Sequence, residues 1–110
     1  MTKKKFRGVV KWFDDKKGYG FITSIKPIEV EVEQEELESY EENNKELQTW
    51  ESDDIFCYYK SILSGNNETS DTKNQFKTLK ENDPVEFVIR DQNGRPQAVD
   101  IIVIKDDNLN

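Results

Sequence analysis

Residues 11–22, KWFDDKKGYGFI, combine aromatic rings and lysines in one short segment of the chain. Strand-forming residue types stand on both sides of a polar turn, so the segment predicts two strands, over 5–13 and 18–24, joined by residues 14–17. Aromatic side chains usually fill a core, and lysines usually keep a surface hydrated. Their mixture in one segment therefore indicates a surface that binds a ligand, although the formal net charge of the chain is -7.

Three further strands are predicted downstream, over 54–59 (DIFCYY), 84–90 (PVEFVIR) and 97–104 (QAVDIIVI). Residues 91–94, DQNG, are a strong turn signal between the last two. Five short strands with a long connection between the second and the third predict an all-β domain. We expect a small barrel or sandwich, because closing the sheet removes its exposed edges. The core should include four apolar residues: Val9, Val10, Ile22 and Phe87.

The acidic residues are concentrated in one part of the chain. Residues 1–26 carry a net charge of +6, residues 27–54 carry -11, and residues 55–110 carry -2. Without the middle segment the protein would be mildly basic. We therefore predict a single domain over 1–110 that contains an acidic insertion at 27–53.

The acidic insertion gives a weaker structural signal. Residues 28–33, IEVEVE, alternate and could form a short strand, whereas the residues after them are richer in helix formers. A sparse apolar stripe predicts a partly helical segment, and its members are Leu37, Tyr40, Leu47 and Trp50. The alternative is an acidic surface excursion anchored by these few side chains. Residues 64–75 are predicted to be a polar loop.

Composition excludes several classes of function. Histidine is absent, which removes Ser-His and Cys-His nucleophile pairs and the commonest general base. The single cysteine, Cys57, leaves no internal disulfide and no CxxC metal site. No apolar run approaches the roughly 20 residues of a membrane span, and the basic N-terminus lacks the apolar core of a signal peptide. We expect a cytoplasmic, monomeric protein that is not an enzyme and uses no metal or cofactor.

Three motifs together resemble the cold-shock domain family: Lys11-Trp12-Phe13, the KGYGFI of residues 17–22 and the IFCYY of residues 55–59. The typical family forms of the last two are KGFGFI and VFVHF. GVVKWF at 8–13 and GRPQAVDI at 94–101 also look like the first and final strands of the family. The resemblance implies a five-stranded OB-fold barrel that binds single-stranded RNA and DNA.

The residues themselves explain how such binding would work. An exposed ring can stack on a base, and a nearby lysine attracts the phosphate beside it. Alternation puts Tyr19 and Phe21 on one face of their strand and Phe56 and Tyr58 on one face of another. We predict a nucleic-acid-binding site made of nine residues: Lys11, Trp12, Phe13, Lys17, Tyr19, Phe21, Phe56, Tyr58 and Tyr59.

Strict alternation sends Trp12 and Phe13 to opposite faces, so their joint use requires a local bulge or bend. Without the motif, Phe21 and Phe56 would more often be core residues than contacts. The lysines at 3–5 are expected to form a solvated tail rather than part of the site.

The sequence departs from the family pattern at Tyr58, which replaces a stacking histidine, at Tyr59, which replaces a phenylalanine, and in its long acidic insertion. We interpret the chain as a cold-shock-like protein or RNA chaperone that binds single-stranded RNA or DNA with low sequence specificity. The alternative is a protein-interaction module whose acidic insertion docks a basic partner protein. Residues 27–54 could also compete with phosphate for the basic groove, or point away as a solvated excursion.

Overall fold

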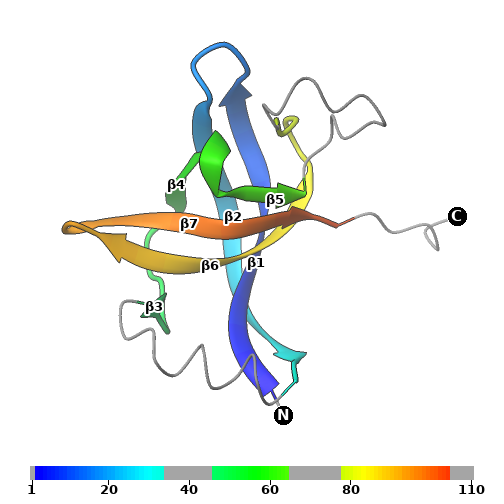
Figure 1. The fold of residues 1–110 in the computed structure, drawn as a ribbon, viewed down its shortest axis with the longest axis vertical. Coiled ribbons are helices and arrows are strands. Elements are labelled where there is room, and N and C mark those ends of the chain that lie inside the picture. Colours follow the sequence, from blue (N-terminus) through cyan, green and yellow to red (C-terminus); the bar gives the residue numbers. More distant parts are fainter. Residues whose placement is uncertain (1, 34–45, 65–77, 105–110) are drawn as a thin grey trace, which may run out of the picture.

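The computed structural model describes residues 2–33, 46–64 and 78–104, which form seven strands and one 3-10 turn (Figure 1). The elements are β1 (Thr2–Asp14), β2 (Tyr19–Glu31), β3 (Glu46–Leu47), β4 (Asp54–Tyr58), η1 (Tyr59–Ser61), β5 (Ile62–Ser64), β6 (Pro84–Gln92) and β7 (Arg95–Val103). The all-β prediction is confirmed, and the five predicted strands correspond to β1, β2, β4, β6 and β7. Within the described ranges, no helix is long and apolar enough to cross a membrane.

Five of the strands close into a ring in the order β6-β1-β2-β4-β7, and β6 and β7 pair to complete it. β1 and β2 form a long antiparallel pair from Thr2↔Glu31 to Asp14↔Tyr19. β4 joins β7 in parallel through Phe56↔Gln97. In Figure 1 the β6–β7 pair crosses the long β1–β2 pair, so the sheet curls around its own inner face. The predicted five-stranded barrel is confirmed.

The β6–β7 hairpin turns at Asn93 and Gly94, between the paired residues Gln92 and Arg95. The φ angle is 56° at Asn93 and 82° at Gly94. A two-residue hairpin of the type I′ class requires positive φ at both positions, and Asn-Gly is its preferred sequence. The turn predicted at 91–94 is therefore formed for the expected stereochemical reason.

The core lies inside the ring and is built from apolar side chains of every major strand. Phe6 and Phe87 stack at its centre, with ring centroids 6.1 Å apart. Val10, Ile22 and Phe87 are fully buried, as predicted. Val9 is only half-buried, so its assignment to the core is wrong. Successive residues of a strand point to opposite faces, and Val10 takes the inward position.

The N-terminal lysines do not form the predicted solvated tail. Lys3, Lys4 and Lys5 belong to β1 and pair with Val30, Glu29 and Ile28 of β2. The Lys3 side chain is buried, with a relative exposure of 8%. β2 also continues to Glu31, so the predicted short strand at the start of the acidic insertion is an extension of β2. The pairing explains both results, since each segment supplies the hydrogen-bonding partner of the other.

The acidic insertion returns to the barrel through β3. Glu46↔Arg90 and Leu47↔Ile89 pair β3 with β6, so Leu47 lies in a strand rather than in the predicted helix. Leu47 and Trp50 both pack against the core. Leu37 and Tyr40, the other members of the predicted helical stripe, lie outside the described residues, as does most of the predicted 64–75 loop.

A charged cluster joins β3 to the barrel. The Glu46 side chain is 2% exposed, and its carboxylate forms an ion pair with the Arg90 guanidinium at 3.3 Å. The same guanidinium lies 3.5 Å from the Asp100 carboxylate. Burial of the carboxyl raises the pKa of Glu46, and the positive charges of Lys3 and Arg90 oppose this rise only in part. The ionised form of Glu46 is therefore disfavoured by folding relative to the protonated form.

This pKa shift gives a prediction for Glu46→Gln. A raised folded-state pKa contributes stability below the unfolded-state value, and this stability is lost as pH rises through the folded-state value. Because glutamine does not titrate, the free energy of unfolding of the native protein, minus that of the variant, should fall as the pH rises above the ordinary pKa of glutamate. Urea unfolding at several pH values measures this difference.

Glu51→Gln is the matched control, because it removes one negative charge from an exposed position of the same segment. A native-minus-variant difference at Glu46 that rises with pH would contradict the prediction. It would mean that pairing with Arg90 outweighs the cost of burying the carboxylate.

Candidate nucleic-acid interface

The loop between β1 and β2 is fixed by Asp14. Its carboxylate accepts hydrogen bonds from the backbone N–H groups of Lys16 and Lys17 at 2.9 and 3.0 Å. The Lys17 hydrogen bond is the main reason that the pKa of Asp14 is lowered. Gly18 completes the turn with a φ of 79° and donates its N–H to the Asp14 carbonyl at 2.7 Å. The turn leaves Lys17 exposed beside Tyr19, the first residue of β2.

A bulge in β1 decides where the next aromatic side chains point. Val10 pairs with Ile22 and Trp12 pairs with Phe21, so Lys11 is the extra residue on β1. The bulge lets Lys11 and Trp12 both face outward, whereas strict alternation would turn Trp12 into the core. Trp12 is 39% exposed, and it lies across from Phe21 on the outer face. The bulge lies at Lys11 and not between Trp12 and Phe13, so these two adjacent rings still point to opposite faces and the predicted joint use of both on the surface is wrong.

Four aromatic rings contact one another on the outer face of β1, β2 and β4. The ring centroids of Trp12 lie 5.9 Å from Tyr19 and 5.4 Å from Phe21. The centroid of Phe56 lies 5.8 Å from each of Tyr19 and Phe21. We call Trp12, Tyr19, Phe21 and Phe56 the ring platform. Its three members on β2 and β4 are half-buried, so each keeps part of its ring accessible to solvent.

The remaining predicted aromatic residues lie beside the platform or beneath it. Tyr58 pairs in register with Tyr19, but its ring contacts that of Tyr59 at 4.8 Å. Tyr59 and Phe13 both pack partly against the core. Phe13 pairs with Gly20, where a Cβ atom would lie 2.7 Å from the Phe13 Cα and 2.1 Å from the Trp12 carbonyl oxygen. Glycine at position 20 therefore allows β1 to approach β2 closely under the platform.

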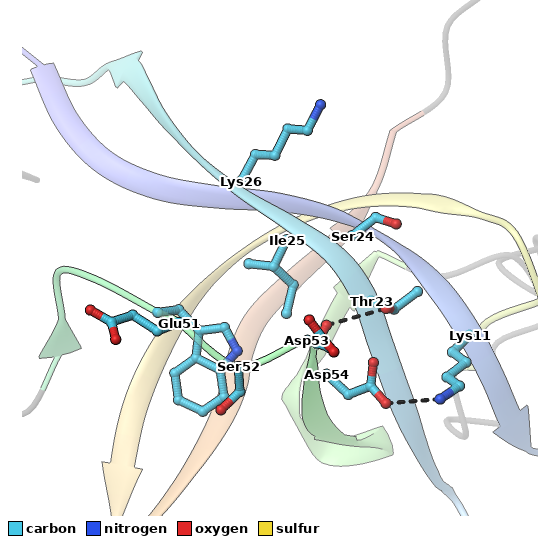
Figure 2. Close-up of a pocket in the computed structure, with 10 residues that line it drawn as sticks. Lys11, Thr23, Ser24, Ile25, Lys26, Glu51, Ser52, Asp53 and Asp54 are labelled. Atoms are coloured by element: carbon cyan, nitrogen blue, oxygen red, sulfur yellow. Dashed lines mark hydrogen bonds and ion pairs between the residues drawn. The ribbon is translucent and has the colours of Figure 1, made fainter.

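The two predicted lysines have different surroundings. The Lys11 ammonium forms an ion pair with the Asp54 carboxylate at 2.9 Å (Figure 2). The hydrogen bond from Lys11 is the largest cause of the lowered pKa of Asp54. The Thr23 hydroxyl donates a hydrogen bond to the backbone carbonyl of Asp53 at 3.2 Å. Thr23↔Asp54 is the neighbouring outward pair after Phe21↔Phe56 on the same two strands. The positive charge of Lys11 is thus partly neutralised within the protein.

A small cavity of about 160 Å³ borders the platform at Phe56, and Arg95, Pro96 and Gln97 line the rest of it. The parallel pairing of Phe56 with Gln97 places the start of β7 beside the rings. Arg95 is exposed and adds a cation at this edge of the platform. It was not among the predicted site residues, although it lies in the GRPQAVDI motif.

The described residues present neither a reactive thiol nor a cluster of metal ligands. Burial raises the pKa of the Cys57 thiol to about 12, so the thiolate is not accessible at neutral pH. Among these residues, no group of three or more His, Cys, Asp or Glu side chains is placed to hold a metal ion.

Known proteins that are similar in sequence to this chain identify its family. No protein-family model matches the chain. A "Cold shock-like protein" of Thermotoga maritima is 34% identical over 100 residues, which cover 90% of this chain and 98% of that protein. The chain belongs to the cold-shock protein family. "Cold shock-like protein CspC" of Escherichia coli K12 is 31% identical over 91% of this chain and 97% of the relative. "Cold shock-like protein CspJ" of Salmonella typhimurium LT2 is 29% identical over 91% and 96%.

Membership of the cold-shock family agrees with the closed barrel and with the rings on its outer face. Cold-shock-like proteins are not enzymes, and the relationship indicates nucleic-acid binding. The nine site residues proposed from the sequence divide into two groups in this structure. Seven lie on or beside the outer face, whereas the remaining two, Phe13 and Tyr59, pack partly against the core.

The close approach at Gly20 generates a prediction. Gly20→Ala should lower the free energy of unfolding by about 2 kcal/mol or more, because the new methyl group would meet backbone atoms that cannot rotate away. It should also change the near-ultraviolet circular dichroism of Trp12. Gly94→Asn is the matched control, since no atom lies within 4 Å of an added Cβ there and asparagine tolerates positive φ. Equal stability of the two variants would contradict the close approach.

Proposed function

We propose that the protein binds single-stranded RNA or DNA with little sequence preference, as a cold-shock-like protein or RNA chaperone. The observation that carries this proposal is the ring platform: four rings in mutual contact on the outer face of a closed barrel. Every nucleobase has a flat π-face, so stacking on such rings contributes about 1–3 kcal/mol per base whatever the sequence. The platform thus supports affinity without base-specific hydrogen bonds.

Cations around the rings support the same proposal. Lys17 is exposed at the turn before Tyr19, and Arg95 is exposed beside Phe56. Phosphates follow each stacked base, so positive charge at both edges of the platform would hold the backbone of the strand. Tyr58 extends the aromatic surface next to Tyr19, and its phenol ring can stack on a base.

Removal of one platform ring tests the proposal. Phe21→Ala or Phe56→Ala should weaken binding of a single-stranded oligonucleotide by about 1–3 kcal/mol while the barrel remains folded. Leu63→Ala is the control, because Leu63 is 52% exposed and lies outside the platform. Fluorescence titration gives the affinity, and circular dichroism checks the fold. Folded variants with unchanged affinity would exclude the platform as the binding surface.

The salt dependence of binding tests the lysines. Lys17→Gln should reduce the slope of log affinity against log salt by about 0.7, the value for one phosphate contact on a single strand. Lys11→Gln should reduce it less, because Asp54 already offsets the Lys11 charge in the free protein. Lys4→Gln, near the start of β1, should leave the slope unchanged. Equal slopes for all three variants would mean that no lysine meets a phosphate at a defined place.

A complete lack of oligonucleotide binding would favour the rival function, a module whose acidic insertion docks a basic partner protein. A Trp50→Phe background should be used for this decision, so that the signal comes from Trp12 on the platform. Quenching of Trp12 by an oligonucleotide is the expected result, because a base stacked on the indole contacts it directly.

A further inference from the structure

A second, larger cavity lies between β2 and the residues that return from the acidic insertion (Figure 2). Its volume is about 600 Å³, within the usual range for ligand sites. One wall comes from β1 and β2 and the other from the segment before β4. The lining residues are Lys11, Thr23, Ser24, Ile25, Lys26, Trp50, Glu51, Ser52, Asp53 and Asp54.

A bulge in β2 shapes the first wall. Arg7 pairs with Lys26 and Val9 pairs with Thr23, so two residues of β2 stand opposite the single residue Gly8. One of these two, Ser24, has a φ of 57°, a left-handed conformation that is uncommon for a residue with a side chain. The regular pairing of β1 and β2 is interrupted at the point where β2 lines the cavity. Bulges often change the direction in which side chains point.

Trp50 forms the apolar part of the second wall. It packs partly against the core, and its Nε1 atom is buried without a hydrogen-bond partner among the described residues. The polar atom of the indole thus faces the protein, and the exposed part of the side chain is carbon. The β3–β6 pairing, four residues earlier in the chain, holds this segment on the barrel. Trp50 and Ile25 are the apolar residues of a lining that is otherwise polar or charged.

The cavity continues the ring platform along the same two strands. Thr23↔Asp54 follows Phe21↔Phe56 by two residues, which is about 7 Å along a strand. Lys11 lines the cavity, and its neighbour Trp12 belongs to the platform. A single strand that crosses the four rings toward this end would bring its next nucleotide to the cavity mouth.

The charges of the lining favour a base over a phosphate. The lining includes three carboxylates, those of Glu51, Asp53 and Asp54, and two ammonium groups. One ammonium, that of Lys11, is already paired with Asp54. The other, Lys26, is exposed, and Figure 2 shows it pointing away from the Lys11–Asp54 pair. A phosphate would be repelled from the interior, whereas a neutral base could enter and leave its phosphate near Lys26.

We propose that this cavity is an additional nucleobase subsite, in which Trp50 and the end of the acidic insertion bind one base beyond the ring platform. The inference rests on the proposed function, since the base must arrive as part of a strand held by the rings. It gives the insertion a direct role in binding, through contacts that the barrel strands alone do not supply.

The two tryptophans of the chain allow the cavity and the ring platform to be tested separately. Trp50→Phe leaves Trp12 as the reporter of the platform, and Trp12→Phe leaves Trp50 as the reporter of the cavity. Each full-length variant is titrated with oligothymidylates of about three and about seven nucleotides, lengths that bracket the lower site sizes of OB folds. The longer strand should change the emission of both tryptophans, and the shorter strand should change mainly that of Trp12.

Ser52→Phe tests the cavity directly, because Ser52 lines it and a phenyl group there would fill the mouth. We expect a loss of about fivefold or more in affinity for the longer strand, the equivalent of one weakly stacked base, with little change for the shorter strand. Thr49→Phe is the matched control, since Thr49 is exposed and lies outside the lining.

The outcomes distinguish failure of the subsite from failure of the proposed function. Quenching of Trp12 by the longer strand with a silent Trp50, or unchanged affinity in Ser52→Phe, would overturn the subsite and leave the proposed function intact. No response from either tryptophan would overturn both. A response of Trp50 to thymidine monophosphate alone, at the concentrations used for the strands, would assign the cavity to free nucleotides and overturn the extension of the strand site.

Discussion

The close pairing of β1 and β2 around Gly20 is the constraint on which the outer face of this barrel depends. Because position 20 has no side chain, the backbone at Trp12 and Phe13 lies directly against β2. The extra residue in β1, Lys11, then turns Trp12 outward and leaves Phe13 against the core. The two adjacent aromatic residues therefore have different structural roles. One contributes to the ring platform, and the other supports the platform from beneath.

The acidic insertion is more closely joined to the barrel than its composition suggests. Its first residues lengthen β2, and its last residues provide β3 and Trp50 and lead directly into Asp54, the partner of Lys11. Both ends of this negatively charged segment are therefore held at defined places on the barrel. At physiological ionic strength, electrostatic effects act over about 8 Å, so Asp53 and Asp54, which line the cavity, act on what it holds.

Alternation, turn signals and motif order were sufficient to predict the five barrel strands, most of the core and the outward position of Phe21 and Phe56. The alternation of residue types could not show that the fourth ring of the platform is Trp12 and not Tyr58. A bulge in β1 shifts the face to which every later residue points by one position. The lysines at 3–5 were misjudged because their pairing partners lie more than twenty residues away. Asp54 could have been found from alternation, since it stands opposite Thr23 beyond the rings. The ten-residue cavity could not, because it depends on a bulge in β2 and on the packing of Trp50.

The position of β3 has a consequence for how this protein behaves in a crowded solution. β1 covers β6 only from Pro84 to Phe87, which leaves the later backbone groups of β6 on that side without a neighbour from the ring. β3 occupies this position at Ile89 and Arg90. An open strand edge is a template on which a second molecule can add its own strand, the first step of edge-to-edge aggregation. The end of the insertion thus covers the part of the β6 edge at Ile89 and Arg90, and these backbone groups are not open to a strand of another molecule.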